Sequence, residues 1–160
     1  MLSQSASELR MPLFTGRFEY SVDDKGRLSI PARMREQVEK EGQDLSFIIT
    51  SISADYLSAY APNEFQELIN SVRESTDPNS RELMRRLTSE AETCPLDKQG
   101  RVTLTNVLRQ LAGLQRDVVV IGVAKRIEIW DRARYEAHRQ ATADVGARLM
   151  SGLKAPADLV

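Results

Sequence analysis

The sequence predicts an α+β fold in which two copies of one unit build a small β-barrel with peripheral helices. Three observations predict this fold. They are a repeated segment, short strands of alternating apolar residues, and a length that suits one shared core. The 160 residues fit one ordinary domain or two small ones. A chain of this length removes roughly 70% of its extended surface from water when it folds as one unit, so it needs neither a metal nor a disulfide.

The repeat is clearest around two turns. Ser21 to Gln37 reads SVDDKGRLSIPARMREQ, and Pro95 to Leu111 reads PLDKQGRVTLTNVLRQL. An offset of 74 aligns Asp23 with Asp97, Gly26 with Gly100, Arg27 with Arg101, and Arg35 with Arg109.

The likeness continues downstream with small gaps. The apolar segment 45–50 matches 118–122, and the alternating run 57–60 matches 127–130. Five residues after each alternating run comes another aromatic ring, Phe65 and Tyr135. The chain is therefore a tandem duplication. A copy of about 60 residues is marginal as an independent fold, so we expect the two copies to share one core.

Each copy reads as strand, turn, strand, helix, strand, strand, helix. In the first copy Phe18, Tyr20 and Val22 alternate with polar residues, which is typical of a half-buried strand. The sequence Asp-Asp-Lys-Gly then predicts a tight hairpin turn with Gly26 at positive φ. The second strand covers 27–30, and a helix is expected from Pro31 to about Lys40, ended by Gly42.

Capping residues predict the other helices. Thr105 or Asn106 can cap the helix of the second copy, and Asn63 is expected to cap the helix after Pro62. That helix has Phe65, Leu68, Ile69 and Val72 on its buried face. The next helix carries Leu83, Met84 and Leu87 as a packing stripe or a protomer contact.

The sequence divides into five predicted parts. They are an N-terminal extension 1–12, a first repeat 13–76, a connecting helix 77–90, a second repeat 91–143 and a tail 144–160. The tail is either a frayed appendage or an oligomer clamp.

Positive charge is concentrated around the two turns. The net charge of −1 excludes a uniformly basic, histone-like surface. Residues 23–35 nevertheless carry four basic against two acidic side chains, and residues 97–109 carry three against one, so each segment is +2 and the remainder is −5. Two basic loops on an otherwise acidic protein suit an anionic polymer better than a small anion, which needs only one site.

The residue types in the turns fit such a partner. The aspartate can accept backbone N–H groups and fix the turn in one shape. The arginine four residues later offers a planar fork of donors that suits phosphate or the edge of guanine, and the glycine lets a flat surface approach the backbone closely. A plain hairpin turn with a local Asp–Arg ion pair is the alternative, and its repetition before a basic helix favours the functional interpretation.

The chain offers little for catalysis. One cysteine excludes an internal disulfide and multi-cysteine zinc sites, and it fits a reducing cytosol. His138 is the only histidine, Cys94 is expected to be buried and inert, and Tyr60 and Trp130 are expected to pack in the core or an interface. There is no P-loop, dinucleotide fingerprint or nucleophile elbow, so we expect no enzyme, cofactor, metal or small-molecule substrate.

The longest apolar stretch, 118–124, is too short to cross a membrane, and residues 1–12 lack the pattern of a secretory signal.

Three segments resemble the MraZ family, which belongs to the SpoVT-AbrB group of swapped-hairpin barrels. They read FTGRFEYSVDDKGRLSIPARMREQ, LDKQGRVTLTNVLRQLAGL and IEIWDRARYEAH, and the likeness covers roughly residues 11–143. The resemblance implies a swapped-hairpin barrel of two pseudo-repeats and protomers assembled into a ring. It also implies a cytoplasmic, nucleoid-associated regulator of the division and cell-wall gene cluster, which binds direct-repeat boxes in promoter DNA.

The resemblance also implies which residues bind DNA. Arg27 and Arg101 would be the principal contacts, with Lys25 and Lys98 as phosphate partners. The whole predicted set is Asp23, Lys25, Gly26, Arg27, Arg33, Arg35, Asp97, Lys98, Gly100, Arg101 and Arg109. The second copy departs from the family pattern: Thr105 stands where a proline is usual, and Val107 matches Arg33, so the second loop binds DNA more weakly or serves in assembly. The alternative function is a non-enzymatic, antitoxin-like barrel module whose basic loops bind a protein partner.

Overall fold

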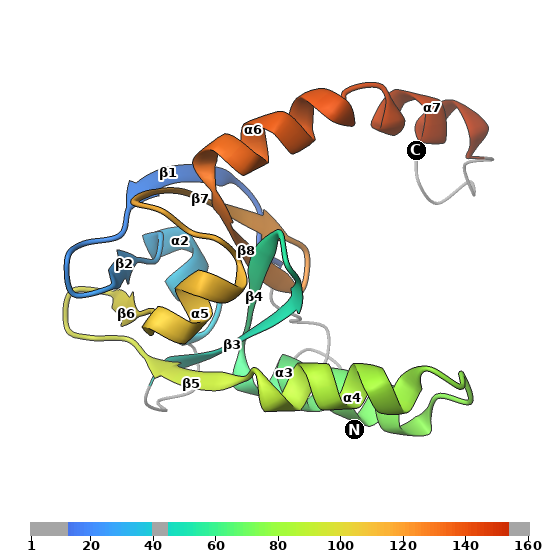
Figure 1. Cartoon of the computed structure of the whole chain (residues 1–160), viewed down its shortest axis with the longest axis horizontal. Helices are drawn as coiled ribbons and strands as arrows, with labels where there is room; N and C mark the ends of the chain where they lie inside the picture. Colours follow the sequence, from blue (N-terminus) through green and yellow to red (C-terminus); the bar gives the residue numbers. More distant parts are fainter. Residues whose placement is uncertain (1–12, 40–44, 154–160) are drawn as a thin grey trace, which may run out of the picture.

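The structure is a computed structural model, and it describes residues 13–39 and 45–153 (Figure 1). It is a mixed α+β fold with antiparallel strands. The first copy contains β1 (Arg17–Ser21), β2 (Arg27–Ser29), α2 (Ala32–Arg35), β3 (Ser46–Ser53), β4 (Tyr56–Tyr60) and α3 (Pro62–Glu74), followed by α4 (Ser80–Ser89). The second contains β5 (Glu92–Pro95), β6 (Arg101–Thr103), α5 (Asn106–Leu111), β7 (Asp117–Val123), β8 (Arg126–Asp131) and α6 (Arg132–Ala141), followed by α7 (Val145–Gly152).

The two copies exchange strands. One sheet has the order β1-β7-β8-β4-β3-β5, and a second sheet consists of β2 and β6. The first strand of each copy therefore pairs with the third strand of the other copy, β1 with β7 and β5 with β3. The remaining strand pairs between the copies, β4 with β8 and β2 with β6, join equivalent strands. This pattern confirms that two interlocking halves make one fold.

The prediction of a hairpin within each copy is wrong in one respect. The tight turn after β1 is present, but β1 pairs with β7 and β2 pairs with β6, so the turn does not join two strands of one ladder. The pairing of β2 with β6 places the fully buried Leu28 opposite the fully buried Val102, so the two copies bury these short strands together. Among the described residues the strands form one six-stranded and one two-stranded sheet, and their closure into a barrel stays a prediction.

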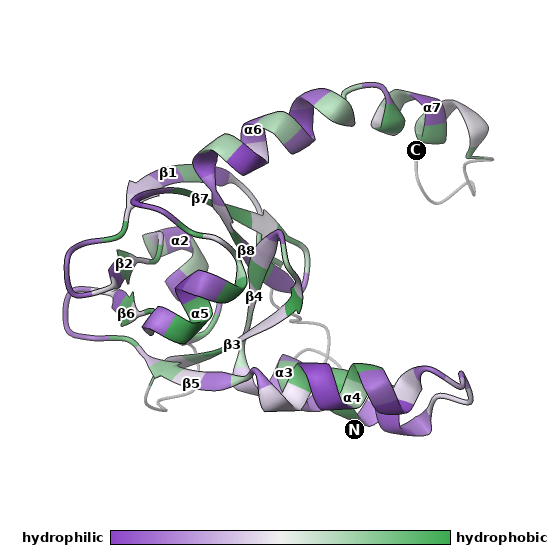
Figure 2. Ribbon diagram, viewed as in Figure 1, coloured by the Kyte–Doolittle hydropathy of each residue, from purple (hydrophilic) through white to green (hydrophobic). Residues whose placement is uncertain are grey.

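The core is common to both copies, as the marginal size of one copy predicts. Leu28 and Val102 face each other across the β2–β6 pair, and both are fully buried. The rings of Phe14 and Phe47 pack 6.3 Å apart in the same cluster. Figure 2 shows the contrast with the outer parts: the two turns that precede β2 and β6 are mostly hydrophilic.

The first helices are shorter or start elsewhere than the sequence predicts. The helix expected from Pro31 to about Lys40 is wrong in length, because α2 ends at Arg35 and Pro31 is its N-cap. Met34 is its only fully buried residue, so little apolar burial supports a longer helix. Gly42, its expected end, lies outside the described residues. The predicted cap at Asn63 is also wrong: Ala61 is the N-cap of α3, and Pro62 occupies its first position. Thr105 does cap α5, since its hydroxyl accepts the Leu108 N–H at 3.2 Å.

The remaining helices extend from the sheets in two places (Figure 1). Helices α3 and α4 pack together as a hairpin. Leu87 of α4 anchors this hairpin, and its side chain has no exposed surface. The predicted stripe is only partly buried, because Leu83 is 39% exposed. Helices α6 and α7 form a separate arm, and neither contains a buried residue. Within residues 13–39 and 45–153, no helix has both the length and the apolar character needed to cross a membrane.

Cys94 is expected to resist modification in the folded protein. It is 4% exposed, and burial raises the pKa of its thiol to about 11. Because the thiolate is the reactive form, an aromatic disulfide reagent at pH 8 should leave the native protein unmodified over an hour. One thiol per chain should react after unfolding in guanidinium, which serves as the control. Rapid, complete reaction of the native protein would show that this strand is open to solvent.

Candidate nucleic-acid interface

The first turn is held together by Asp23. Its Oδ1 accepts the backbone N–H groups of Lys25 at 3.0 Å and Arg27 at 2.8 Å. Its Oδ2 accepts Nε–H of the Arg27 guanidinium at 2.6 Å. Gly26 has a φ of 81° and donates its N–H to the Asp23 carbonyl at 2.9 Å. One carboxylate thus fixes both the backbone of the turn and the direction of the arginine.

The second turn repeats this geometry. Asp97 Oδ1 accepts the N–H groups of Gln99 at 2.8 Å and Arg101 at 2.9 Å, and Oδ2 accepts Arg101 Nε–H at 2.8 Å. Gly100 has a φ of 76° and donates to the Asp97 carbonyl at 3.0 Å. The repeated sequence therefore encodes two equivalent rigid turns. Both turns contain the local Asp–Arg ion pair that the alternative interpretation, a plain hairpin turn, predicts.

The ion pairs leave part of each arginine accessible. The side chains of Arg27 and Arg101 are 33% and 25% exposed. Among the described residues, only Nε of each guanidinium takes part in a hydrogen bond or ion pair, and the two terminal nitrogens do not. A guanidinium anchored through Nε still presents its terminal N–H groups to a second acceptor, as bidentate recognition of phosphate or guanine requires.

Both arginines lie on the same side of the β2–β6 ribbon. Arg27 is opposite Thr103, and Arg101 is opposite Ser29. Since side chains alternate along a strand, these four share one face, while Leu28 and Val102 fill the core on the other. Arg27 and Arg101 are diagonal neighbours, a relation that places Cα atoms about 7–8 Å apart. In Figure 1 the two turns lie side by side at the left of the molecule.

The other predicted residues divide into two groups. Lys25 and Lys98 are exposed on the turns, and Arg33 is exposed on α2. Arg35 and Arg109 are only partly exposed, because each guanidinium packs against the turn of the other copy. The position equivalent to Arg33 is Val107, an apolar side chain that is 60% exposed.

The space over each turn glycine is filled from within the protein. A Cβ atom at Gly100 would lie 2.6 Å from Cζ of Arg35, and one at Gly26 would lie 2.5 Å from the carbonyl oxygen of Leu104. The close approach that the glycines permit is therefore made by groups of the other copy. The equivalent positions of Arg35 and Arg109 are the one sequence feature that relates to this packing.

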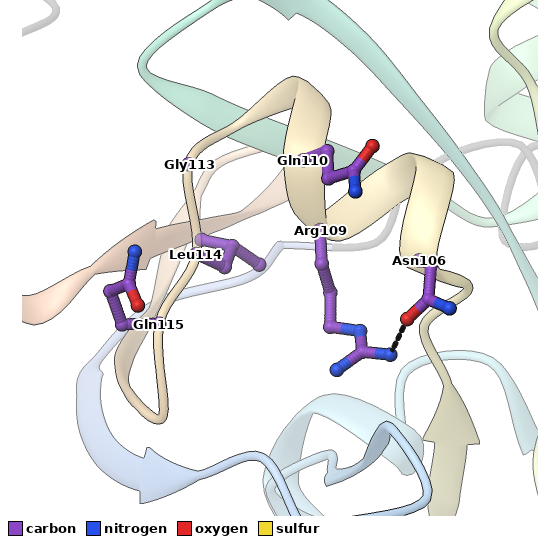
Figure 3. A pocket seen from close by; sticks show the side chains of 6 residues that line it. All are labelled: Asn106, Arg109, Gln110, Gly113, Leu114 and Gln115. Carbon is purple, nitrogen blue, oxygen red and sulfur yellow. Dashed lines mark hydrogen bonds between the residues drawn. The ribbon is translucent and has the colours of Figure 1, made fainter.

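A surface hollow of about 400 Å³ lies beside α5 (Figure 3). Figure 3 shows Arg109 and Asn106 on one side of the helix, joined by the hydrogen bond from Arg109 Nη2 to Asn106 Oδ1. Gln110, Gly113, Leu114 and Gln115 complete the lining. The hollow has no acid, base and nucleophile brought together, and it borders the interface only through Arg109.

Trp130 is surrounded by three rings, those of Tyr56, Tyr135 and His138. Its ring lies 4.8 Å from that of Tyr56 and 4.9 Å from that of His138. Its indole N–H donates to Glu128 at 3.0 Å, and this buried carboxylate also accepts two N–H groups of Arg126. No sequence pattern singled out this pair, although Glu128 stands between Ile127 and Ile129. Trp130 and Tyr60 are buried, as expected.

The turn carboxylates are expected to stay ionised into the acid range. Backbone hydrogen bonds from Arg27 and Arg101 are the main cause that holds the pKa of Asp23 and Asp97 below the ordinary 3.8. A lowered folded pKa gives stability that is present above the unfolded pKa, about 3.9, and is lost as the pH falls through the folded value. A carboxyl ¹³C NMR titration should give midpoints below 3.8 for both residues. Midpoints above it would contradict the turn geometry.

Comparison with known proteins places the chain in one family. A family model described as "MraZ protein, putative antitoxin-like" matches residues 13–86 and again residues 87–148. A protein named transcriptional regulator MraZ from Limosilactobacillus fermentum is 42% identical over 142 residues, which are 88% of this chain and 96% of the relative. Proteins of the same name from Moorella thermoacetica and Syntrophobacter fumaroxidans are 38% and 36% identical, over 82% and 87% of this chain and 90% and 93% of their own length. The chain, with its doubled turn and exchanged strands, belongs to the MraZ family.

Proposed function

We propose that the protein is a sequence-specific, DNA-binding transcriptional regulator without enzymatic activity. The observation that carries the proposal is the placement of Arg27 and Arg101 on one outward face. Each is anchored by an aspartate, and the terminal N–H groups of each have no partner in the part of the chain that the structure describes. The relatives named transcriptional regulator MraZ support the same class of function.

In this proposal the two turns form one DNA-binding surface. Arg27 and Arg101 read base edges or clamp phosphates, and the exposed Lys25, Lys98 and Arg33 neutralise neighbouring phosphates. The glycines shape the turns, and Asp23 and Asp97 orient the arginines without touching DNA. Because the second copy carries Val107 in place of Arg33, it lacks the phosphate contact proposed for Arg33.

The proposal includes a ring of protomers that binds direct repeats. One protomer offers few positive charges, so it should bind weakly, whereas linked protomers gain affinity through effective concentration. Repeats in one direction fit head-to-tail interfaces. Support for assembly comes from α7 and its C-cap residue Leu153, because Leu149, Met150 and Leu153 are 62%, 70% and 55% exposed. The strand exchange supports the closed swapped-hairpin barrel that goes with this assembly.

The proposed targets are the boxes upstream of the division and cell-wall gene cluster, and the proposed location is the cytoplasm, on the nucleoid. A mobility-shift assay with the DNA upstream of the gene tests this. We expect a shifted band whose affinity falls steeply between 50 and 200 mM salt, as the release of counterions requires. A scrambled duplex of equal length serves as the control. Equal binding to both would contradict sequence specificity, and no shift would favour the antitoxin-like module that binds a protein partner.

The assembly has its own test. Light scattering at micromolar concentration should give a mass of several 18.0 kDa protomers. A monomeric mass would refute the ring without affecting the assignment of the turns.

A further inference from the structure

We propose that Arg35 and Arg109 are positioning residues, each of which holds the DNA-binding turn of the other copy in shape. The inference rests on the proposed function and assigns these two arginines a role different from direct DNA contact, which the sequence suggested for them. It makes each turn dependent on a side chain that lies in the other half of the chain.

Arg35 is placed over the second turn. A Cβ at Gly100 would lie 2.6 Å from Cζ and Nη1 of Arg35 and 2.7 Å from its Nε, so the guanidinium covers the Gly100 backbone at contact distance. Arg35 Nε donates to the Ile30 carbonyl at 3.1 Å, and the Ile30 N–H donates to the Gly100 carbonyl at 3.0 Å. The arginine, the end of its own strand and the opposite turn thus form one connected unit.

Arg109 occupies the equivalent place over the first turn. A Cβ at Gly26 would lie 3.5 Å from Cζ and Nη2 of Arg109. The Leu104 N–H donates to the Gly26 carbonyl at 2.7 Å, which repeats the bond between Ile30 and Gly100. Here the guanidinium is tied to Asn106 through Nη2 instead of to a strand carbonyl. We call each guanidinium together with the turn glycine that it covers a clamp. The two clamps are equivalent in position, and the guanidinium of Arg35 lies nearer to its glycine than that of Arg109.

The physical reason for a clamp is that an exposed Asp–Arg ion pair stabilises a turn only weakly. Each turn must nevertheless hold its arginine in one direction, because ordering it only upon binding would cost affinity. A planar guanidinium packed on the glycine peptide limits the motion of the turn without blocking the outer face that carries Arg27 and Arg101.

Hydrogen exchange tests the clamp in the absence of DNA. In Arg35→Ala, exchange of the amides at 99–101 should accelerate by about tenfold, while exchange at 25–27 stays within about twofold of the wild type, since local openings follow local contacts. Arg109→Ala should give the reverse pattern. Arg33→Ala is the matched control, because it removes the same charge from α2 and should alter neither turn. Equal acceleration in both turns, or none in the opposite turn, would overturn the proposal.

DNA binding adds a second readout. Loss of a phosphate contact lowers the salt-dependence slope by about one, so Arg33→Ala should lower it and Arg35→Ala should weaken affinity with the slope unchanged. Arg35→Lys keeps the charge but not the planar fork, so it should not restore affinity. Full rescue by lysine with a reduced slope in Arg35→Ala would make Arg35 a direct contact and overturn the proposal. Failure of the wild type to bind DNA would refute the proposed function, while the exchange pattern would still decide the clamp.

Discussion

Replacing both Arg27 and Arg101 by alanine should weaken binding to the upstream duplex by at least about thirtyfold. An arginine that reads a base contributes roughly 1–3 kcal/mol, and two such residues on one surface combine to at least about 2 kcal/mol. In an assembly that engages several boxes the loss recurs in every protomer and should exceed this value. Titration of labelled DNA followed by fluorescence anisotropy measures it.

A matched control separates the loss of two contacts from the loss of charge. Arg85 lies on α4, where its side chain is 72% exposed and, within residues 13–39 and 45–153, pairs with Glu82 alone. Arg85→Ala should change DNA affinity by less than about twofold, since an exposed surface pair contributes little. Thermal unfolding of the Arg27/Arg101 variant should stay close to that of the wild type. Unchanged affinity in that folded variant would remove both turns from the DNA surface and favour a protein-binding module.

Gly26→Ala should destabilise the protein by about 2–4 kcal/mol. Positive φ at a residue with a Cβ costs roughly 1–2 kcal/mol. The Cβ would also lie 2.5 Å from the carbonyl oxygen of Leu104, whose N–H bonds to the Gly26 carbonyl. Moving Leu104 away sacrifices that bond, which adds about 1 kcal/mol or more. The melting temperature should fall by about 5–15 °C, given 2–4 °C per kcal/mol for a chain of this size.

The control for this substitution lies in α7. Nothing stands within 4 Å of a Cβ at Gly146, and the position is inside a helix. Gly146→Ala should therefore leave the stability unchanged or raise it by up to about 1 kcal/mol, because alanine favours the helix. A Gly26→Ala protein as stable as the wild type would show that the two copies do not meet at the first turn as described.

The parts of the fold that the sequence predicts are those encoded locally. The offset of 74 identifies two equivalent turns, and the Asp-x-x-x-Arg spacing predicts the carboxylate that bonds both the backbone and the arginine. The alternation in β1 is also confirmed, since Phe18 and Tyr20 are partly buried and their neighbours exposed. The geometry of each turn and the alternation in β1 depend on residues within five positions of one another.

Features that depend on distant residues were not predictable in the same way. Each copy contains suitable strands, so periodicity alone favours a hairpin. The exchange is implied only by the resemblance to swapped-hairpin barrels, and the pairing of β1 with β7 shows it. Arg35 and Arg109 appear in the sequence as spare basic residues beside a DNA-binding turn. Their packing on the opposite glycine follows from the β2–β6 contact, which no local pattern specifies. The helix expected to reach Lys40 ends at Arg35 because its continuation offers few apolar residues for burial.

The central claim is that DNA lies across the two turns, and lysine footprinting with mass spectrometry tests it most directly. Of the lysines in the described residues, Lys25 and Lys98 lie on the turns and Lys125 lies between β7 and β8, and all three are exposed. Acetylation of the free protein should label all three. Bound upstream duplex should protect Lys25 and Lys98 together and leave Lys125 reactive. Protection of Lys125 with both turn lysines still reactive would place the DNA elsewhere and contradict the account.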